Sequence, residues 1–209
     1  MKKFKEFLNF SSYIGSHTLL YGETNTYKTY VTALFVKYLV EEREYDPLDI
    51  TVLDFAPKLR HFNQMKIGGK ISHYYNNVNK CNLIEFQDEI IPPRLNATNL
   101  KELMHNICAN YKKTSYSIQQ FNSKPTQILI INDISIHLHL GNYKDILKMV
   151  RKSNTFFGNS YNGESISTKK QFTSLLSLKE KKFVERLIET IQQSINMNEF
   201  VSNLKDLIK

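Results

Sequence analysis

Thr18-Leu-Leu-Tyr-Gly22-Glu-Thr-Asn-Thr-Tyr-Lys28-Thr29 is the segment from which we infer the fold of this chain. A short apolar run ends at Gly22, and after five further residues comes Lys28-Thr29. Apolar residues then recur with the period of a helix, at Val31, Leu34, Phe35, Tyr38 and Leu39. The segment therefore predicts a strand, a loop and a helix in that order.

A loop between a strand and a helix suits a phosphate group, because backbone N–H groups at the helix N-terminus face an anion and the helix dipole attracts it. In the pattern G-x-x-x-x-G-K-[ST], the lysine reaches the β- and γ-phosphates and the hydroxyl binds Mg²⁺. Lys28 and Thr29 match these two positions. The remaining candidate nucleotide-binding residues are those of the loop: Gly22, Glu23, Thr24, Asn25, Thr26 and Tyr27.

Tyr27 stands where this pattern has its second glycine. Glycine suits the position because it accepts a positive φ and lets the backbone approach a phosphate. A tyrosine in left-handed geometry costs roughly 1–2 kcal/mol, a strain that functional sites often carry. The alternative is a rearranged polar turn that binds no nucleotide.

Two further segments read as buried strands that end on a carboxylate, Asp49–Asp54 and Gln127–Asp133. In a parallel α/β sheet, ligands gather at the carboxyl ends of the strands, so both carboxylates are expected on the edge that carries the phosphate loop. Asp133 is a candidate for holding Mg²⁺, usually through water. Asp54 is a second candidate metal ligand, although a strand-end aspartate can equally cap the turn that follows.

The composition is that of an ordinary globular protein, with 209 residues, 41% hydrophobic and 23% charged, and it favours a single domain over residues 1–209. We expect no membrane segment, because no apolar run is long enough to span a bilayer. We expect a cytoplasmic protein, because Cys81 and Cys108 lack CxxC spacing and read as reduced thiols. The net charge of +8 favours polyanionic partners such as a nucleotide or a nucleic acid, although lysine-rich coding gives the same sum. The sequence leaves open whether the protein is a monomer or an oligomer.

Residues 56–98 form an irregular insertion punctuated by glycine and proline. Four cations (Lys58, Arg60, Lys66, Lys70) lie there among aromatic residues, a combination that suits a single-stranded nucleic acid, although a solvated excursion is the commoner explanation. Asn99-Leu-Lys-Glu102 predicts the start of a helix. Residues 134–141 read as a strand carrying His137 and His139, too few ligands for zinc.

The C-terminal part begins with a predicted strand near residue 155 that runs into a polar loop containing Asn159. The amide of Asn159 is a candidate contact to a γ-phosphate, and the alternative is a simple turn without a ligand. Residues 174–209 read as C-terminal helices, and Ser177-Leu-Lys-Glu180 resembles a capping box.

With the loop, Asp54 and Asp133 together, residues 17–160 resemble the P-loop NTPases, most closely the RecA-like or broader ASCE branch. The chain is also similar to archaeal P-loop proteins without an assigned activity. The resemblance implies a three-layer α/β/α fold with a mostly parallel sheet, in which one strand separates the strands that bear Walker A and Walker B. It also implies ATP and Mg²⁺ as ligands, Lys28 and Asp133 as catalytic residues, and Asn159 as the polar sensor.

The departures from the family pattern concern hydrolysis. Ile134 follows Asp133 where many members carry a catalytic glutamate, and Phe55-Ala-Pro-Lys58 offers none after Asp54. Glu85 and Glu23 are substitutes that the sequence does not rank. Because orienting the attacking water is a major protein contribution, we expect ATP binding with at most slow hydrolysis.

Three functions are compatible with these sequence features. The first is an ATP–Mg²⁺-binding protein that acts as a weak ATPase or an ATP-dependent switch. The second is a phosphotransferase, in which the insertion covers an acceptor and Arg94 or Arg151 neutralises the transferred charge. The third is a non-enzymatic nucleic-acid-binding or assembly protein on a degenerate P-loop scaffold.

Overall fold

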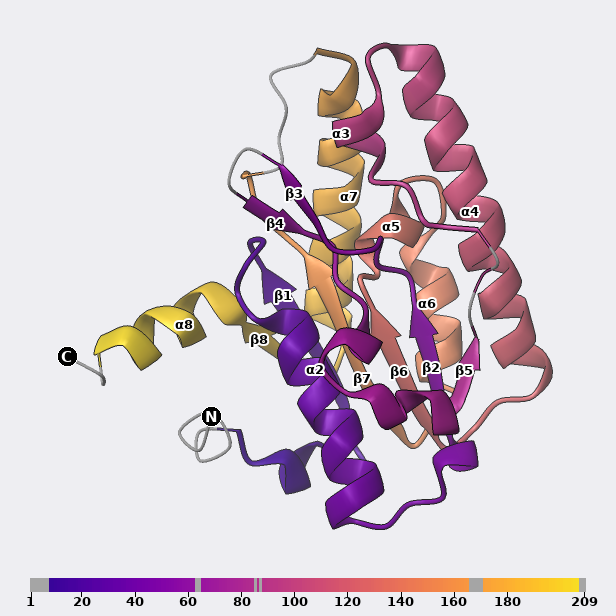
Figure 1. Cartoon of the computed structure of the whole chain (residues 1–209), viewed down its shortest axis with the longest axis vertical. Helices are drawn as coiled ribbons and strands as arrows, with labels where there is room; N and C mark the ends of the chain where they lie inside the picture. The colour runs from indigo at the N-terminus through magenta and orange to yellow at the C-terminus, as the bar shows by residue number, and fades with distance from the viewer. Residues whose placement is uncertain (1–7, 63–64, 85, 87, 166–170, 207–209) are drawn as a thin grey trace.

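The structure is a computed structural model that describes residues 8–62, 65–84, 86, 88–165 and 171–206. Its centre is a six-stranded sheet with the order β5-β2-β6-β7-β1-β8, in which every neighbouring pair runs parallel (Figure 1). The strands are β1 (His17–Gly22), β2 (Ile50–Asp54), β5 (Asn82–Ile84), β6 (Ile128–Asn132), β7 (Thr155–Tyr161) and β8 (Gln193–Asn196).

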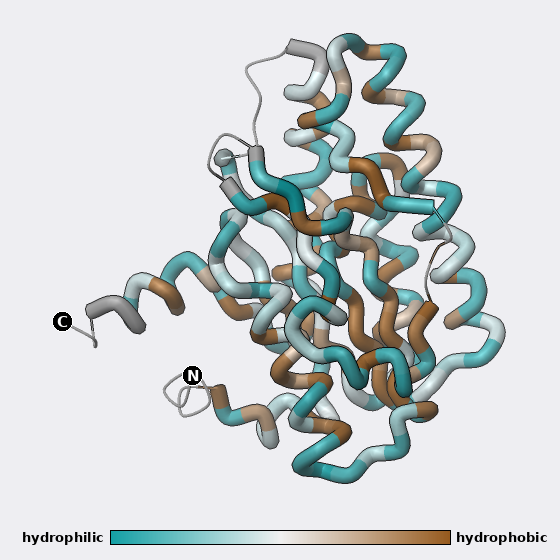
Figure 2. The backbone as a smooth tube through the Cα atoms, in the orientation of Figure 1, coloured by the Kyte–Doolittle hydropathy of each residue, from teal (hydrophilic) through white to brown (hydrophobic). Residues whose placement is uncertain are grey.

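The central strands are buried on both faces, as the aliphatic run in the sequence predicts. Every residue of β2 and β6 is buried, and these strands stand out as hydrophobic in Figure 2. Ile128 and Ile130 face one side of the sheet, whereas Leu129 and Ile131 face the other, because successive strand residues point in opposite directions.

Helices cover both faces, which confirms the expected three-layer α/β/α architecture. On one face, α2 (Lys28–Lys37) packs Phe35 against Phe157 of β7, with ring centroids 4.4 Å apart. A π-helical turn, Tyr38–Glu42, continues α2. The opposite face is covered by α4 (Leu100–Ser123), α5 (Ser135–Leu138), α6 (Tyr143–Val150) and α7 (Gln171–Thr190).

The strand order separates β1 from β6 by one strand. β7 pairs with β1 on one side and with β6 on the other. Because all three run in the same direction, the ends of β1, β6 and β7 meet at one edge of the sheet. This edge carries the loop that follows Gly22, the residues after Asn132 and the polar end of β7.

The insertion at residues 56–98 folds over this same edge (Figure 1). It contains an antiparallel hairpin of β3 (Arg60–Phe62) and β4 (Met65–Ile67), and a short helix α3 (Pro93–Asn96). Two 3₁₀ turns, Ile71–His73 and Asn76–Lys80, lead into β5, which joins the main sheet beside β2. The segment therefore contributes β5 to the main sheet, and its β3–β4 hairpin and α3 cover the carboxyl edge.

Several predictions made from local sequence are wrong. Asn159 lies inside strand β7 instead of in a loop that follows it. Residues 135–138 form helix α5 instead of a strand. Ser177 lies inside α7, where its hydroxyl bonds to the Thr173 carbonyl, so Ser177–Glu180 is not a capping box. By contrast, Asn99 does cap α4 by accepting a hydrogen bond from the Glu102 amide.

The C-terminal part is not wholly helical, because residues 193–196 form β8 before α8 (Met197–Asp206) begins. The segment Gln193-Ser-Ile-Asn196 is short and half-buried, so it gives no clear strand pattern. It pairs with β1 and thereby satisfies backbone groups that would otherwise form an open sheet edge. Within the described residues, no helix has both the length and the apolar character needed to cross a membrane.

Candidate functional site

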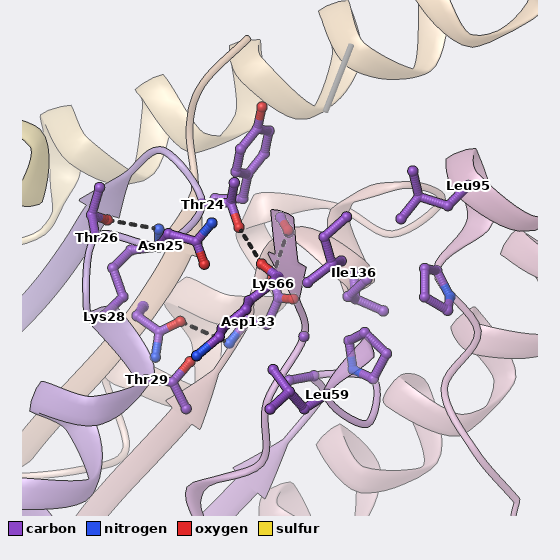
Figure 3. Close-up of a pocket in the computed structure, with 18 of the residues that line it drawn as sticks. Thr24, Asn25, Thr26, Lys28, Thr29, Leu59, Lys66, Leu95, Asp133 and Ile136 are labelled. Carbon is purple, nitrogen blue, oxygen red and sulfur yellow. Dashed lines mark hydrogen bonds between the residues drawn. The ribbon is translucent and has the colours of Figure 1, made fainter. Parts of the chain in front are cut away.

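A cavity of about 690 Å³ opens over the carboxyl edge of the sheet, a size ordinary for a small-molecule site. Its walls come from the loop after β1, the start of α2, the residues after β6, the end of β7, the insertion and α7. Figure 3 shows Thr26, Lys28 and Thr29 on one side of it and Asp133 near its centre.

The loop after β1 contains two non-glycine residues with left-handed backbone, a conformation that is costly for residues other than glycine. Tyr27 has φ 61° and ψ 13°, the left-handed one of the two alternatives that the sequence left open, and Asn25 has φ 59°. Gly22 has φ 146°, and a Cβ atom there would lie 2.8 Å from Asn198 Oδ1. Two non-glycine residues of the loop thus have left-handed backbone, at a cost of roughly 1–2 kcal/mol for Tyr27.

Strained backbone is concentrated around this cavity. Four described non-glycine residues have a positive φ, and three of them, Asn25, Tyr27 and Asp133, line the cavity. Such strain persists only where the surrounding structure enforces it, and it clusters at functional sites.

Lys28 is held inside the loop. Its Nζ donates hydrogen bonds to the Gly22 carbonyl (2.9 Å), the Glu23 carbonyl and the Thr26 hydroxyl (3.2 Å). Burial lowers the pKa of Lys28 to about 8, although Asp133 and Glu23 favour its charged form. Within the described residues, the amides of Lys28 and Thr29 have no backbone acceptor, as expected for the first turn of a helix.

The side chain of Thr29 contacts Asn132, a residue that the sequence did not single out. The Thr29 hydroxyl donates to Asn132 Oδ1 (3.1 Å), and Asn159 Nδ2 donates to the same oxygen (2.9 Å). Asn132 Nδ2 donates to Asp54 Oδ1 (2.8 Å) and to the Gly69 carbonyl (3.0 Å). All four hydrogen-bonding positions of this buried amide are therefore used.

Asp54 lies behind the site and does not line the cavity. Its carboxylate accepts hydrogen bonds from the amides of Ala56 and Ile71 as well as from Asn132, and Lys70 Nζ lies 3.7 Å away. Burial raises the pKa of this carboxyl group, and Lys70 and the hydrogen bonds oppose that shift. These partners make Asp54 the anchor of Asn132 and of the turn after β2, which is the capping role that the sequence left open. The role of Asp54 as a metal ligand stays a prediction.

Asp133 does line the cavity. Its amide donates to Asn159 Oδ1 (3.1 Å), and its Oδ1 accepts a hydrogen bond from the Ser135 hydroxyl (2.6 Å). Burial raises the pKa of Asp133, whereas Ser135 and the nearby Lys28 charge lower it. Asn159 therefore links Asp133 with Asn132, and the predicted residues Thr29, Asp133 and Asn159 come together.

A second polar cluster, which the sequence does not suggest, also lines the cavity. Arg94 of α3 is paired with Glu180 of α7, and His139 Nε2 lies 3.4 Å from Glu180 Oε2 and 3.3 Å from Arg94 Nη2. All three side chains are buried and line the cavity. Desolvation and the Arg94 charge hold the pKa of His139 well below its usual value, so the imidazole is neutral.

The phosphate-loop candidate is also fixed from outside by segments far along the chain. The Glu23 carboxylate accepts hydrogen bonds from the amides of Glu164 and Ser165, and from the Ser165 hydroxyl. The Glu23 amide donates to Asn198 of α8 (2.8 Å). Glu23 is thus occupied in holding the loop, and Glu85, the other carboxylate considered for orienting water, lies outside the described residues.

Most of the basic residues in the insertion have acidic partners within the protein. Lys58 and Arg60 both pair with Glu89, at 2.6 and 2.8 Å, and Lys70 pairs with Asp54. These ion pairs involve three of the four cations in the predicted nucleic-acid groove, and that groove stays a prediction. Arg151 precedes β7 and so lies toward the opposite edge of the sheet, away from the cavity.

No protein-family model matches the chain, and no curated protein matches it.

Proposed function

We propose that this chain is an ATP–Mg²⁺-binding protein of the P-loop type that acts as a weak ATPase or an ATP-dependent switch. The observation that carries the proposal is the loop itself: Tyr27 adopts the left-handed conformation normally given to glycine, and Lys28 lies enclosed by the loop. A parallel sheet in which β7 separates β1 from β6 adds support, because this is the arrangement expected of the RecA-like branch.

The loop provides the chemistry that a triphosphate needs. The amides of Lys28 and Thr29 at the start of α2 would face the phosphates, with the helix dipole behind them. Lys28 would exchange its bonds to the Gly22 and Glu23 carbonyls for charge-assisted bonds to phosphate oxygens. The strain at Tyr27 is maintained by the fold, so the loop is organised before the ligand arrives.

Mg²⁺ also fits the residues present. It prefers one or two protein oxygens together with water and phosphate oxygens, so it needs no dedicated cage. Among the described residues there is no group of three or more His, Cys, Asp or Glu side chains suited to a metal. The Thr29 hydroxyl donates its proton to Asn132 and keeps lone pairs for the ion, and Asp133 would hold a water of its coordination shell.

Slow hydrolysis is the expected activity. The residue that contacts the Thr29 hydroxyl is Asn132, whose uncharged amide cannot act as a base. The carboxylate at the cavity wall belongs to the next residue in the chain, Asp133. The side chain of Asp133 is shorter than that of a glutamate and is tied to Ser135, which limits its ability to orient an attacking water. Glu23 is engaged by Ser165 and offers no replacement.

Isothermal titration calorimetry with a non-hydrolysable ATP analogue and Mg²⁺ tests the proposal. Lys28→Ala is expected to weaken binding by about 10- to 100-fold, because one charge-assisted hydrogen bond contributes about 1.5–3 kcal/mol. Lys37→Ala is the matched control, since Lys37 lies on the same helix and pairs with Glu41 at its surface. Equal affinity of Lys28→Ala and wild type would exclude the loop as the nucleotide site.

A further inference from the structure

The cavity has two halves of different chemistry. The polar half consists of the phosphate-loop candidate with Asp133 and Asn159. The apolar half is formed by Pro57, Leu59, Pro92, Pro93, Leu95 and Ile136, mostly from the insertion. Figure 3 shows Leu59, Leu95 and Ile136 away from Thr26 and Lys28, with Asp133 between the two groups.

The apolar half ends at the buried cluster of Arg94, His139 and Glu180. Within the described residues, Arg94 Nε and His139 Nδ1 are buried nitrogen atoms without a hydrogen-bond partner. Unsatisfied buried polar atoms are costly and call for an explanation, of which a missing ligand is one. Glu180 already balances the Arg94 charge and His139 is neutral, so the cluster suits an uncharged polar group.

We propose that the apolar half holds the second substrate of a phosphoryl transfer, an uncharged alcohol with a mainly apolar body and one further hydrogen-bond-accepting oxygen. This inference rests on the proposed nucleotide site. The further oxygen would accept a hydrogen bond from Arg94, the body would contact Leu59 and Leu95, and the hydroxyl would reach Asp133 at the junction of the two halves.

The reaction is a balanced displacement at phosphorus. The alcohol oxygen bonds to the γ-phosphorus while the bond from that phosphorus to the β–γ bridging oxygen breaks, and ADP departs with the bonding electrons. The hydroxyl proton passes to an oxygen of the transferred phosphoryl group, so the step needs no separate base. The products are a phosphate monoester and ADP.

Two features favour an apolar acceptor here over the nucleobase. A base edge needs N–H donors as well as acceptors, yet three of these six apolar positions are prolines, which offer a carbonyl but no N–H group. The same apolar wall excludes water, which favours transfer to a bound alcohol over hydrolysis. Both features come mainly from the insertion, the part of the chain that covers the cavity.

The test uses the full chain and 3-hydroxybenzyl alcohol as the probe, with glycerol as the polar comparison, in saturation-transfer NMR at about 5 mM, a range suited to weak fragments. We expect the aromatic alcohol to bind and glycerol not to bind. Leu95→Ser should weaken alcohol binding roughly fivefold while leaving affinity for the ATP analogue within about twofold. Leu48→Ser, at an exposed leucine remote from the cavity, is the matched control.

The outcomes separate this inference from the nucleotide proposal. Alcohol binding without any ATP binding would refute the nucleotide site and with it the transfer reaction, whereas ATP binding without alcohol binding would overturn this inference alone. A parallel loss of ATP and alcohol affinity in Leu95→Ser would show that the apolar half holds the base and overturn the inference. With ATP and Mg²⁺ added, ³¹P NMR should reveal a phosphate ester of the probe. Inorganic phosphate alone, or no binding of the aromatic alcohol by wild type, would also overturn it.

Discussion

Replacing Asn132 by aspartate would place a second carboxylate against Asp54 in the interior. Asn132 Nδ2 now donates to Asp54 Oδ1 at 2.8 Å, and both side chains are buried. In Asn132→Asp that donor becomes an acceptor, and two like charges meet. The substitution changes almost no volume, so its effect reports on the hydrogen-bond network alone.

The folded variant can either keep both carboxylates ionised or protonate one of them. The response that costs less free energy sets the loss of stability. If both carboxylates stayed ionised about 3 Å apart, their repulsion would be roughly 5 kcal/mol at an effective dielectric constant of 20. Protonating one of them at pH 7 costs about 4 kcal/mol, because an ordinary aspartate has a pKa near 3.9. We therefore expect Asn132→Asp to lower the free energy of unfolding by about 4 kcal/mol at pH 7.

The cost must shrink as the pH falls. The folded variant binds a proton that the unfolded chain releases above its ordinary pKa, so stability decreases with rising pH by about 1.4 kcal/mol per pH unit. At pH 5 the expected cost is about 1.5 kcal/mol. Urea unfolding followed by circular dichroism at pH 5 and pH 7 measures both values.

Asn142→Asp is the matched control, because Asn142 caps α6 by accepting a hydrogen bond from the Lys144 amide, and aspartate caps equally well. Its stability should stay within about 0.5 kcal/mol of wild type. An Asn132→Asp variant as stable as wild type at pH 7, or one with the same cost at both pH values, would refute the predicted clash of carboxylates.

Three further predictions concern the loop and the buried cluster. Tyr27→Gly should bind the ATP analogue within about threefold of wild type, whereas Tyr27→Val should lose about tenfold by calorimetry, because a β-branched residue resists positive φ. Between pH 7 and pH 9 the ATP affinity of wild type should fall about tenfold more than that of Lys28→Ala, since Lys28 has a pKa of about 8 and binds phosphate in its protonated form; parallel pH profiles would contradict this role. Arg94→Ala should cost about 3–5 kcal/mol in urea unfolding by leaving Glu180 buried and unpaired, and Arg94→Met with Glu180→Gln should recover most of the loss; no recovery would mean that Arg94 acts chiefly through packing.

Sequence alone predicted the parts of the fold that local patterns encode. The aliphatic run before Asn132 identified a strand buried on both faces, and the Gly22–Thr29 segment identified the strand, the loop and the helix around it. The left-handed conformation of Tyr27 was one of two alternatives that the sequence left open, the other being a rearranged polar turn.

Local sequence patterns did not predict the features that depend on tertiary contacts. The role of Asn132 depends on Thr29 and Asp54, which are far apart in the chain, and Asp133 beside it was the more obvious residue. Glu180 had the appearance of a helix cap, and only the packing of α7 against α3 makes it a buried partner of Arg94. Strand β8 forms because β1 offers an open edge, a fact absent from its own four residues.

A crystal structure of the full chain with a non-hydrolysable ATP analogue and Mg²⁺ tests the central claim most directly. We predict the triphosphate inside the Gly22–Thr29 loop, with Lys28 Nζ moved from the Gly22 and Glu23 carbonyls to phosphate oxygens, the Thr29 hydroxyl on Mg²⁺ and Tyr27 still left-handed. A triphosphate bound elsewhere, or Lys28 still bonded to those two carbonyls in the complex, would contradict it.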